Sequence, residues 1–318
     1  MRQAAALFPK KALFRANLAL YASFGSDFQT AQREAQAAQE LDPSYPTAFM
    51  ALVFGQLGQG LLRQATETYQ RLEKINNLGA SYASSGLADR ALYEGRFTDA
   101  VRMLEQGAME DSAAKYPDRA ALKLVTLAYT RLLQGQKTQA VAAAESALAN
   151  SKTVKIRFLT GRIFASAGQT ARAQELATSL ASEVQSEPQV YAKLIEGEVA
   201  LANGDPRGAI NAFTQANNQV DTWIGRFDRG RAYLEIGAFA EADSDFDRCI
   251  KRRGEVLSLF VDPWPTYGYF PPVYYYLGRV REGLRSARST ESYRIYLSIR
   301  GKADEDPLLG EVRKRAGL

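Results

Sequence analysis

The stretch GRAYLEIGAFAEADSDF, residues 230–246, contains two apolar patterns of helical spacing with a glycine between them. After Gly237, the residues Phe239, Ala242 and Phe246 follow one another at steps of three and four, which places them on one face of a helix. Glycine commonly ends a helix because it adopts the left-handed backbone conformation found at helix termini. The stretch therefore predicts two helices joined by a tight turn at Gly237.

A glycine with the same surroundings recurs along most of the chain. The seven positions are Gly25, Gly60, Gly95, Gly135, Gly168, Gly204 and Gly237. Successive glycines are 33 to 40 residues apart. A period of about 34 residues indicates a stack of helical hairpins, in which each hairpin buries its apolar face against its neighbours. The fold class is therefore expected to be all-α.

Small residues mark the faces where the two helices of each hairpin cross. In the first unit these are Ala31, Ala35 and Ala38, and Pro43 closes the unit. Closely crossing helices leave no room for larger side chains at such positions. This pattern, with large apolar or aromatic residues at regular spacing, resembles the tetratricopeptide repeat family over nearly the whole chain. The resemblance implies a right-handed superhelical solenoid of about eight hairpins.

The irregularities of the period suggest three parts. Residues 1–250 are expected to form seven hairpins, preceded by a segment that looks like the tail of another repeat. Because of this segment, we hypothesise that the chain is a fragment of a longer protein. Residues 251–272 interrupt the period with an insertion rich in aromatic residues and proline. Residues 273–318 are expected to form a final, degenerate hairpin, with Arg285 or Ser286 in place of the turn glycine.

Composition argues against catalysis. The chain has no histidine, which removes the usual general base and the commonest metal ligand. Its one cysteine, Cys249, is expected to be a buried small hydrophobe. Phosphate-binding glycine loops and nucleophile motifs are absent from the sequence. We therefore expect no enzyme activity in this chain and no cofactor, metal or catalytic residue.

Four segments resemble a narrower group of proteins. Residues 86–97, 271–279, 291–297 and 304–308 resemble the carboxy-terminal repeat region of bacterial proteins whose amino-terminal half is a eukaryotic-like serine/threonine kinase. The resemblance implies a non-catalytic arm, with any kinase activity in a domain upstream. No apolar stretch is long enough to span a membrane. The compartment is left open: cytoplasmic, or extracytoplasmic if a membrane anchor lies upstream.

The family resemblance also implies which residues face the concave groove. Its ninth repeat position is occupied here by Ala19, Phe54, Asp89, Tyr129, Arg162, Glu198, Arg231 and Arg279. The fifth position, which is mostly apolar, is occupied by Arg15, Met50, Ser85, Val125, Phe158, Leu194, Phe227 and Tyr275. The candidate partner-binding residues are Phe54, Tyr129, Phe158, Arg162, Glu198, Phe227, Arg231, Tyr275 and Arg279.

Two interpretations fit the charged part of this row. Because arginine binds carboxylates through a planar pair of donors, Arg162, Arg231 and Arg279 could hold an acidic segment of a partner. Alternatively, Arg162 and Arg231 pair with Glu198 between neighbouring helices. The apolar fifth-position residues likewise could serve as anchors for a partner or belong to the core between repeats.

The insertion also allows two interpretations. Its aromatic residues Trp264, Tyr267, Tyr269 and Phe270 could form an accessory recognition element beside the groove, or a hydrophobic strap folded over the last repeats. The net charge of the chain is +5, and residues 251–318 alone carry 13 Lys and Arg against 8 Asp and Glu. No continuous basic stripe accompanies this charge, so nucleic acid is not an expected partner.

These observations favour a protein-interaction scaffold, in the form of the docking or sensory arm of a larger bacterial signalling protein. The expected partner is a protein or peptide segment, with an acidic segment as one possibility. The first alternative is a regulatory domain that senses a small molecule. The second is a module that self-associates through exposed aromatic residues between Tyr267 and Tyr276. The sequence names neither the partner nor the oligomeric state.

Overall fold

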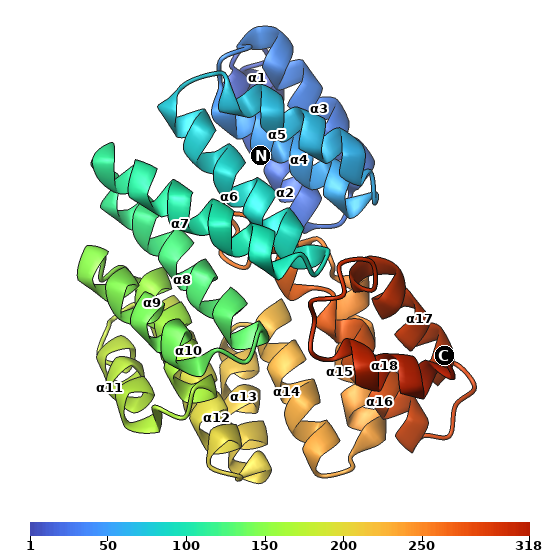
Figure 1. Ribbon diagram of the computed structural model, residues 1–318. Helices are drawn as coiled ribbons and strands as arrows, with labels where there is room; N and C mark the ends of the chain where they lie inside the picture. The colour runs from blue at the N-terminus through green and yellow to red at the C-terminus, as the bar shows by residue number, and fades with distance from the viewer. The chain divides into compact units, whose positions relative to one another are not determined.

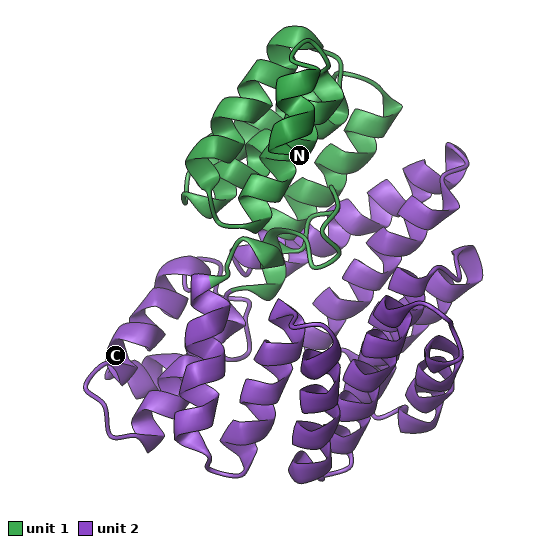
Figure 2. Cartoon of the chain, turned by 180° about the vertical axis from the view of Figure 1, so that it is seen from behind, with its two compact units in different colours: residues 1–90, 252–270 green, residues 91–251, 271–318 purple.

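A computed structural model describes all 318 residues and contains eighteen α-helices, two short 3-10 helices and no strand (Figure 1). The helices α2 to α17 follow one another as eight helical hairpins. The prediction of an all-helical array of about eight hairpins is therefore confirmed. The chain divides into two compact units, unit 1 (residues 1–90 and 252–270) and unit 2 (residues 91–251 and 271–318), which Figure 2 shows in green and purple.

Unit 1 holds the first two hairpins, most of α6 and the insertion. Its elements are α1 (Arg2–Leu7), α2 (Ala12–Phe24), α3 (Phe28–Leu41), α4 (Pro46–Gly58), α5 (Leu62–Glu73), α6 (Asn77–Tyr93, whose last residues belong to unit 2), η1 (Glu255–Leu257) and η2 (Tyr267–Tyr269).

Unit 2 holds the remaining helices. They are α7 (Phe97–Ala113), α8 (Pro117–Leu133), α9 (Lys137–Asn150), α10 (Val154–Ser166), α11 (Thr170–Ala181), α12 (Ser186–Ala202), α13 (Pro206–Gln219), α14 (Trp223–Glu235), α15 (Phe239–Lys251), α16 (Pro272–Gly283), α17 (Ser289–Arg300) and α18 (Leu309–Ala316).

Six of the seven recurring glycines adopt the left-handed conformation at the turn of their hairpin, with φ between 71° and 87°. The expectation was wrong for Gly25, whose φ is −77°. There the next residue, Ser26, adopts φ 63° instead. In the eighth hairpin Arg285 takes this conformation with φ 53°, so a left-handed residue is present at the turn even where glycine is not.

Small residues allow the two helices of a hairpin to approach closely, as the repeat pattern predicts. Ala31, Ala35 and Ala38 are fully buried on one face of α3. Glycines on the first helices are packed by aromatic rings from other helices: a Cβ at Gly278 would lie 2.4 Å from a ring atom of Tyr293. Side chains therefore fill the space between the helices, and only small residues fit at the crossing points.

The insertion is not a regular helix, as its prolines predict, and most of it belongs to unit 1. We call residues 252–270 the strap. Its η1 turn contacts α2 and α4, and the Gly254 N–H donates to Ser26 Oγ at 3.1 Å. The strap therefore packs within unit 1, against hairpins that precede it by about 200 residues of chain.

Candidate functional site

The inner wall of unit 2 is formed by the first helices of successive hairpins. Arg162 lies on α10, Glu198 on α12 and Arg231 on α14, at equivalent positions of three consecutive repeats. Arg162 reaches across α12 to Asp228 on α14, with Nη2 donating to Oδ1 at 3.0 Å. A side chain can span two repeats in this way only if the three helices curve around a common interior, so these residues lie on the concave side.

Four of these charged side chains form one neutral cluster, Arg162, Glu198, Asp228 and Arg231, which we call the ionic cluster. Arg231 Nη1 donates to Glu198 Oε1 at 2.7 Å and to Asp228 Oδ1 at 3.2 Å. Arg162 Nη2 lies 3.2 Å from Glu198 Oε1. The interpretation in which Arg162 and Arg231 pair with Glu198 therefore describes the structure, with Asp228 as an additional partner.

Burial raises the pKa of each of the two carboxylates, and the neighbouring arginines lower it. Asp228 is fully buried, and this burial, only partly opposed by Arg162, raises the pKa of its carboxyl to about 6. For Glu198, burial opposes ionisation, but Arg231 and Arg162 together hold the pKa below its ordinary value. Glu198 is therefore the firmly charged partner of the two arginines, while burial leaves the pKa of Asp228 above its ordinary value.

Unit 2 closes on itself opposite this cluster. Arg300, at the end of α17, is almost fully buried and donates through Nη2 to the Leu92 carbonyl at 3.3 Å and through Nε to the Tyr93 carbonyl at 3.4 Å. Beyond α17, the carboxylate of Glu305 accepts from the Thr98 N–H at 2.6 Å. The last hairpin thus contacts the third, and Arg300 satisfies carbonyls at the end of α6 that have no partner within the helix.

Tyr129 lies inside this closed arrangement. Its ring packs against a buried cluster made by the end of α6 and the start of α7 (Ala91, Leu92, Phe97 and Ala100). Burial raises the pKa of Tyr129 to about 12, and the nearest charged groups that act on it include Arg300, Arg162 and Arg231. The interior wall is therefore largely filled by its own side chains rather than open along its length.

A pocket of about 550 Å³ lies on this wall. It is lined by Ser166, Glu198, Leu201, Ala202, Gly204, Pro206, Arg231, Glu235 and Tyr276. These residues come from α10, α12, the start of α13, α14 and α16, and the floor is formed by the Glu198 and Arg231 members of the ionic cluster. Pockets of this size accommodate small ligands or one or two residues of a peptide. We call it the α12–α14 pocket.

The pocket presents polar groups that have no partner in the protein. Arg231 uses only Nη1 in the ionic cluster, so its Nε and Nη2 donors make no hydrogen bond within the chain. Glu235, one turn later on α14, is exposed and forms no ion pair, and the hydroxyl of Tyr276 accepts and donates no hydrogen bond to protein atoms. These groups are available to a ligand, whereas the carboxylates of Glu198 and Asp228 are already paired with arginines.

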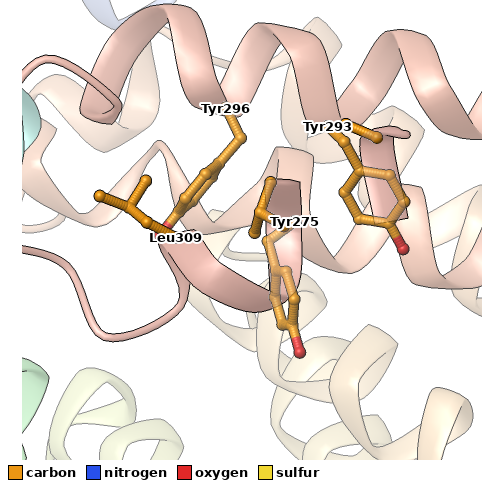
Figure 3. Close-up of a cluster of buried hydrophobic side chains, with 6 residues drawn as sticks. Tyr275, Tyr293, Tyr296 and Leu309 are labelled. Atoms are coloured by element: carbon orange, nitrogen blue, oxygen red, sulfur yellow. The ribbon is translucent and has the colours of Figure 1, made fainter. Parts of the chain in front are cut away.

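The aromatic candidates of the fifth repeat position lie in the core between repeats. Phe158 stacks on Tyr191 with ring centroids 4.2 Å apart, and Phe227 stacks on Trp223 at 5.3 Å. Tyr275 belongs to a buried cluster with Tyr293, Tyr296 and Leu309 (Figure 3). The Phe158–Tyr191 stack joins two neighbouring hairpins, and the other rings pack within α14 or between α16, α17 and α18.

The two remaining groove candidates do not line the pocket. Phe54, at the ninth position of the second repeat, is fully buried in unit 1 with its ring centroid 6.1 Å from that of Phe24. Arg279 on α16 donates through Nη1 to the Tyr275 hydroxyl at 3.0 Å and lies 3.8 Å from Glu311. The predicted row of three groove arginines is therefore not continuous, because Arg279 is engaged with α16 and α18.

The accessory aromatic residues of the strap are not exposed. Trp264, Tyr267 and Phe270 are 4%, 5% and 2% exposed, and Tyr269 is half-buried. Tyr274 and Tyr276 are also half-buried, so the expectation of an exposed aromatic surface between Tyr267 and Tyr276 was wrong. The apolar composition of this segment serves its packing.

Beneath the strap lies a buried carboxylate. Asp89 on α6, 3% exposed, accepts hydrogen bonds from the backbone N–H groups of Tyr267 and Gly268, each at 2.9 Å. Burial raises the pKa of Asp89 to about 7, and the two N–H donors only partly offset this. The repeat pattern assigned Asp89 to the groove, but its carboxylate fastens the strap.

Sequence reasoning missed three residues of the candidate site. Asp228 and Tyr276 occupy the sixth repeat position and Glu235 the thirteenth; the family pattern turns both positions inward, but the candidates came only from the fifth and ninth. Asp228 precedes Arg231 by three residues and Glu235 follows it by four, so both share its helix face, and this spacing was the available signal. Nothing in the sequence placed Tyr276 beside α14.

Comparison with known proteins agrees with this architecture. Residues 196–252 match the model of the tetratricopeptide repeat family. Residues 196–252 therefore carry the tetratricopeptide repeat pattern, and the array has a fold of a class that typically binds partners and is typically non-catalytic. No curated protein sequence matches the chain.

Several solved structures are similar in fold. A Rap protein complexed with competence and sporulation factor is 14% identical, with 96% of this chain and 92% of that chain covered and a TM-score of 0.53. A human IFIT1 dimer with m7Gppp-AAAA is 17% identical, with 86% and 68% covered and a TM-score of 0.51. A tetratricopeptide repeat protein from Parabacteroides merdae is 15% identical, with 96% and 99% covered and a TM-score of 0.46. At such identities the likeness shows the fold alone.

The structure lacks both a membrane-spanning helix and a cluster of metal-ligating side chains. None of the helices combines the length and the apolar composition that crossing a membrane requires. No group of three or more Cys, Asp or Glu side chains is arranged so that it could hold a metal ion.

Proposed function

We propose that this chain is a non-catalytic binding module whose ligand site is the α12–α14 pocket. The observation that carries the proposal is the set of polar groups in the pocket without a protein partner: the free donors of Arg231, the carboxylate of Glu235 and the hydroxyl of Tyr276. Tetratricopeptide arrays bind other molecules on their concave side, and the pocket lies on that side of unit 2.

The shape of the site favours a short ligand over a long extended segment. Because Arg300 and Glu305 contact the end of α6 and the start of α7, the interior of unit 2 offers a bounded pocket rather than a continuous groove. A peptide end, a single side chain of a partner protein, or a small molecule fits a volume of about 550 Å³. Two proteins similar in fold were solved with molecules bound, a Rap protein and human IFIT1.

The charge of the site does not favour a purely acidic partner. Arg162 and Arg231 are balanced by Glu198 and Asp228, and Glu235 adds one uncompensated negative charge. An acidic ligand would therefore meet a site that is neutral to negative overall, despite the arginine at its floor. This electrostatic balance argues for ligands that carry a cationic group.

We further propose that the module is the docking or sensory arm of a larger bacterial signalling protein. The support is the resemblance of residues 86–97, 271–279, 291–297 and 304–308 to the repeat region of kinase-linked bacterial proteins. Sensing of a small molecule is the variant of this proposal that the bounded pocket favours. Sequencing the gene upstream of Met1 tests it, because a kinase or other catalytic domain in frame is expected there.

A thermal-shift screen with short peptides and metabolites tests the binding site itself. A ligand that binds the folded state raises the melting temperature. Ala202 lines the pocket and is exposed, so Ala202→Trp fills the pocket without entering the core. Ala149→Trp, at an exposed position of α9, is the matched control. Ligands are expected to stabilise the wild type and Ala149→Trp but not Ala202→Trp; equal stabilisation of all three would place the site elsewhere.

A further inference from the structure

The proposed binding site displays one cationic and one anionic group that do not pair with each other. Arg231 and Glu235 are four residues apart on α14, yet their charged groups form no ion pair. Two features explain this. Arginine preceding glutamate is the less favourable order for a pair at this spacing in a helix, and Nη1 of Arg231 is held toward Glu198 and Asp228.

The fixed position of Arg231 prepares it to bind an anionic group. Its side chain is 26% exposed, while its partners Glu198 and Asp228 are 4% and 0% exposed. The buried carboxylates therefore orient the guanidinium from behind, and its remaining N–H donors face the pocket. Charge-assisted hydrogen bonds from such a fixed pair of donors are the usual way in which arginine binds a carboxylate.

Glu235 supplies the opposite charge at the other end of the same helix face. It lies in the last turn of α14, where the helix dipole is negative and adds to the attraction for a cation. A rise of 1.5 Å per residue places Arg231 and Glu235 about 6 Å apart along the helix axis. A ligand that satisfies both must carry a cation and an anion separated by a short distance.

We propose that the α12–α14 pocket binds a zwitterion, specifically a free α-amino acid, with its carboxylate on Arg231 and its ammonium on Glu235. This inference rests on the proposed function of the pocket. An α-amino acid carries both groups on one carbon, so it suits a cation and an anion that lie one helical turn apart on the same helix. The side chain of the ligand then lies against Leu201, Ala202 and the ring of Tyr276.

The same two charges could also come from a protein partner, through adjacent acidic and basic side chains. Isothermal titration calorimetry on the full chain separates the two sources. One arm uses the twenty free amino acids and their N-acetyl and amide derivatives. The other arm uses a peptide with blocked ends that carries neighbouring lysine and aspartate residues.

At least one free amino acid is expected to bind, and either blocking group should weaken it about tenfold or more, because each removes one charged hydrogen bond. Glu235→Gln should weaken binding by a similar factor and abolish the extra penalty for the N-acetyl derivative. Glu235 is exposed and unpaired, so this variant is expected to fold normally. Glu175→Gln, at an exposed, unpaired position of α11, is the control and should bind like the wild type.

Three outcomes would overturn the inference: no free amino acid binding at about 10 mM, binding indifferent to both blocking groups, or binding of the blocked peptide alone. The proposed function fails separately. Suppose that no amino acid binds, but that other compounds stabilise the wild type and fail to stabilise Ala202→Trp. The pocket is then a binding site, and only its assignment to amino acids is wrong.

Discussion

Replacing Arg162 by methionine is expected to destabilise unit 2 by about 3–5 kcal/mol, because it breaks a buried ion-pair cluster without removing the partner charges. The Arg162 side chain is 12% exposed and faces Glu198 and Asp228, which are 4% and 0% exposed. Methionine retains most of the packing volume beside the Phe158 ring, 5.6 Å from the guanidinium. The loss of stability is therefore due mainly to the two buried carboxylates, which are left with Arg231 as their shared cationic partner.

The size of this loss should depend on pH in a defined direction. The pKa of Asp228 is already raised to about 6 by burial, and Arg162 is the strongest influence that lowers it. Without Arg162 the pKa of Asp228 rises further, so the carboxyl takes up a proton near neutrality and the repulsion from Glu198 disappears. The variant should therefore be most destabilised near pH 8 and less so near pH 5.5.

Urea denaturation and thermal melts followed by circular dichroism measure both effects. For a unit of about 200 residues, 3 kcal/mol corresponds to a fall of roughly 6–12 °C in the melting temperature. Arg313→Met is the matched control, because Arg313 pairs with Asp304 at 2.7 Å but both side chains are largely exposed. The control should lose less than about 1 kcal/mol. Equal losses in the two variants, or a loss at Arg162 that grows on acidification, would refute the reasoning.

Three further outcomes are expected. In an NMR titration, the chemical shift of the Asp89 carboxyl carbon should change with a midpoint near pH 7. Because the pKa of Asp89 is higher in the folded than in the unfolded chain, its contribution to stability is complete below about pH 4 and is lost as the pH rises to about 7. Asp89→Asn should remove this pH dependence of stability. A titration midpoint near 4 would contradict the burial argument. Gly86→Ala should lower the free energy of unfolding by about 1–3 kcal/mol, because the new Cβ would lie 2.0 Å from a ring atom of Tyr69. Gly310→Ala is the control, since the space around Gly310 is open, and it should leave stability unchanged or raise it in denaturant melts. Arg285→Gly should stabilise the chain by about 0.5–1 kcal/mol, since Arg285 occupies φ 53°; a loss of stability would show that its side chain contributes more than the strain costs.

The hairpin array could be predicted from the sequence because its determinants are local. A turn glycine, a face of alanines and a helical apolar pattern each act within about 20 residues, and repetition of the unit made the pattern secure. Gly25 shows the limit of such reasoning. The left-handed residue of that turn is its neighbour Ser26, whose hydroxyl also accepts from Gly254 N–H more than 200 residues later.

The candidate site could be predicted only in part. The repeat positions correctly brought Arg162, Glu198 and Arg231 together, because equivalent positions of adjacent repeats are neighbours in space. The same rule assigned Phe158 and Phe227 to the groove, although each stacks on an aromatic ring in the core. Repeat position determines the direction in which a side chain points. The curvature of the array determines whether the space in that direction is open to solvent or filled by other side chains.

The sequence by itself determined that this chain is a stack of helical hairpins with a basic carboxy-terminal part and an aromatic insertion. Only the tertiary structure decided that the arginines are neutralised by Glu198 and Asp228, that the strap is held by Asp89, and that Arg231 and Glu235 are left to face a pocket. These outcomes depend on contacts between residues far apart in the chain. Such contacts are selected by packing and by the requirement that buried charges find partners, and neither can be read from local spacing.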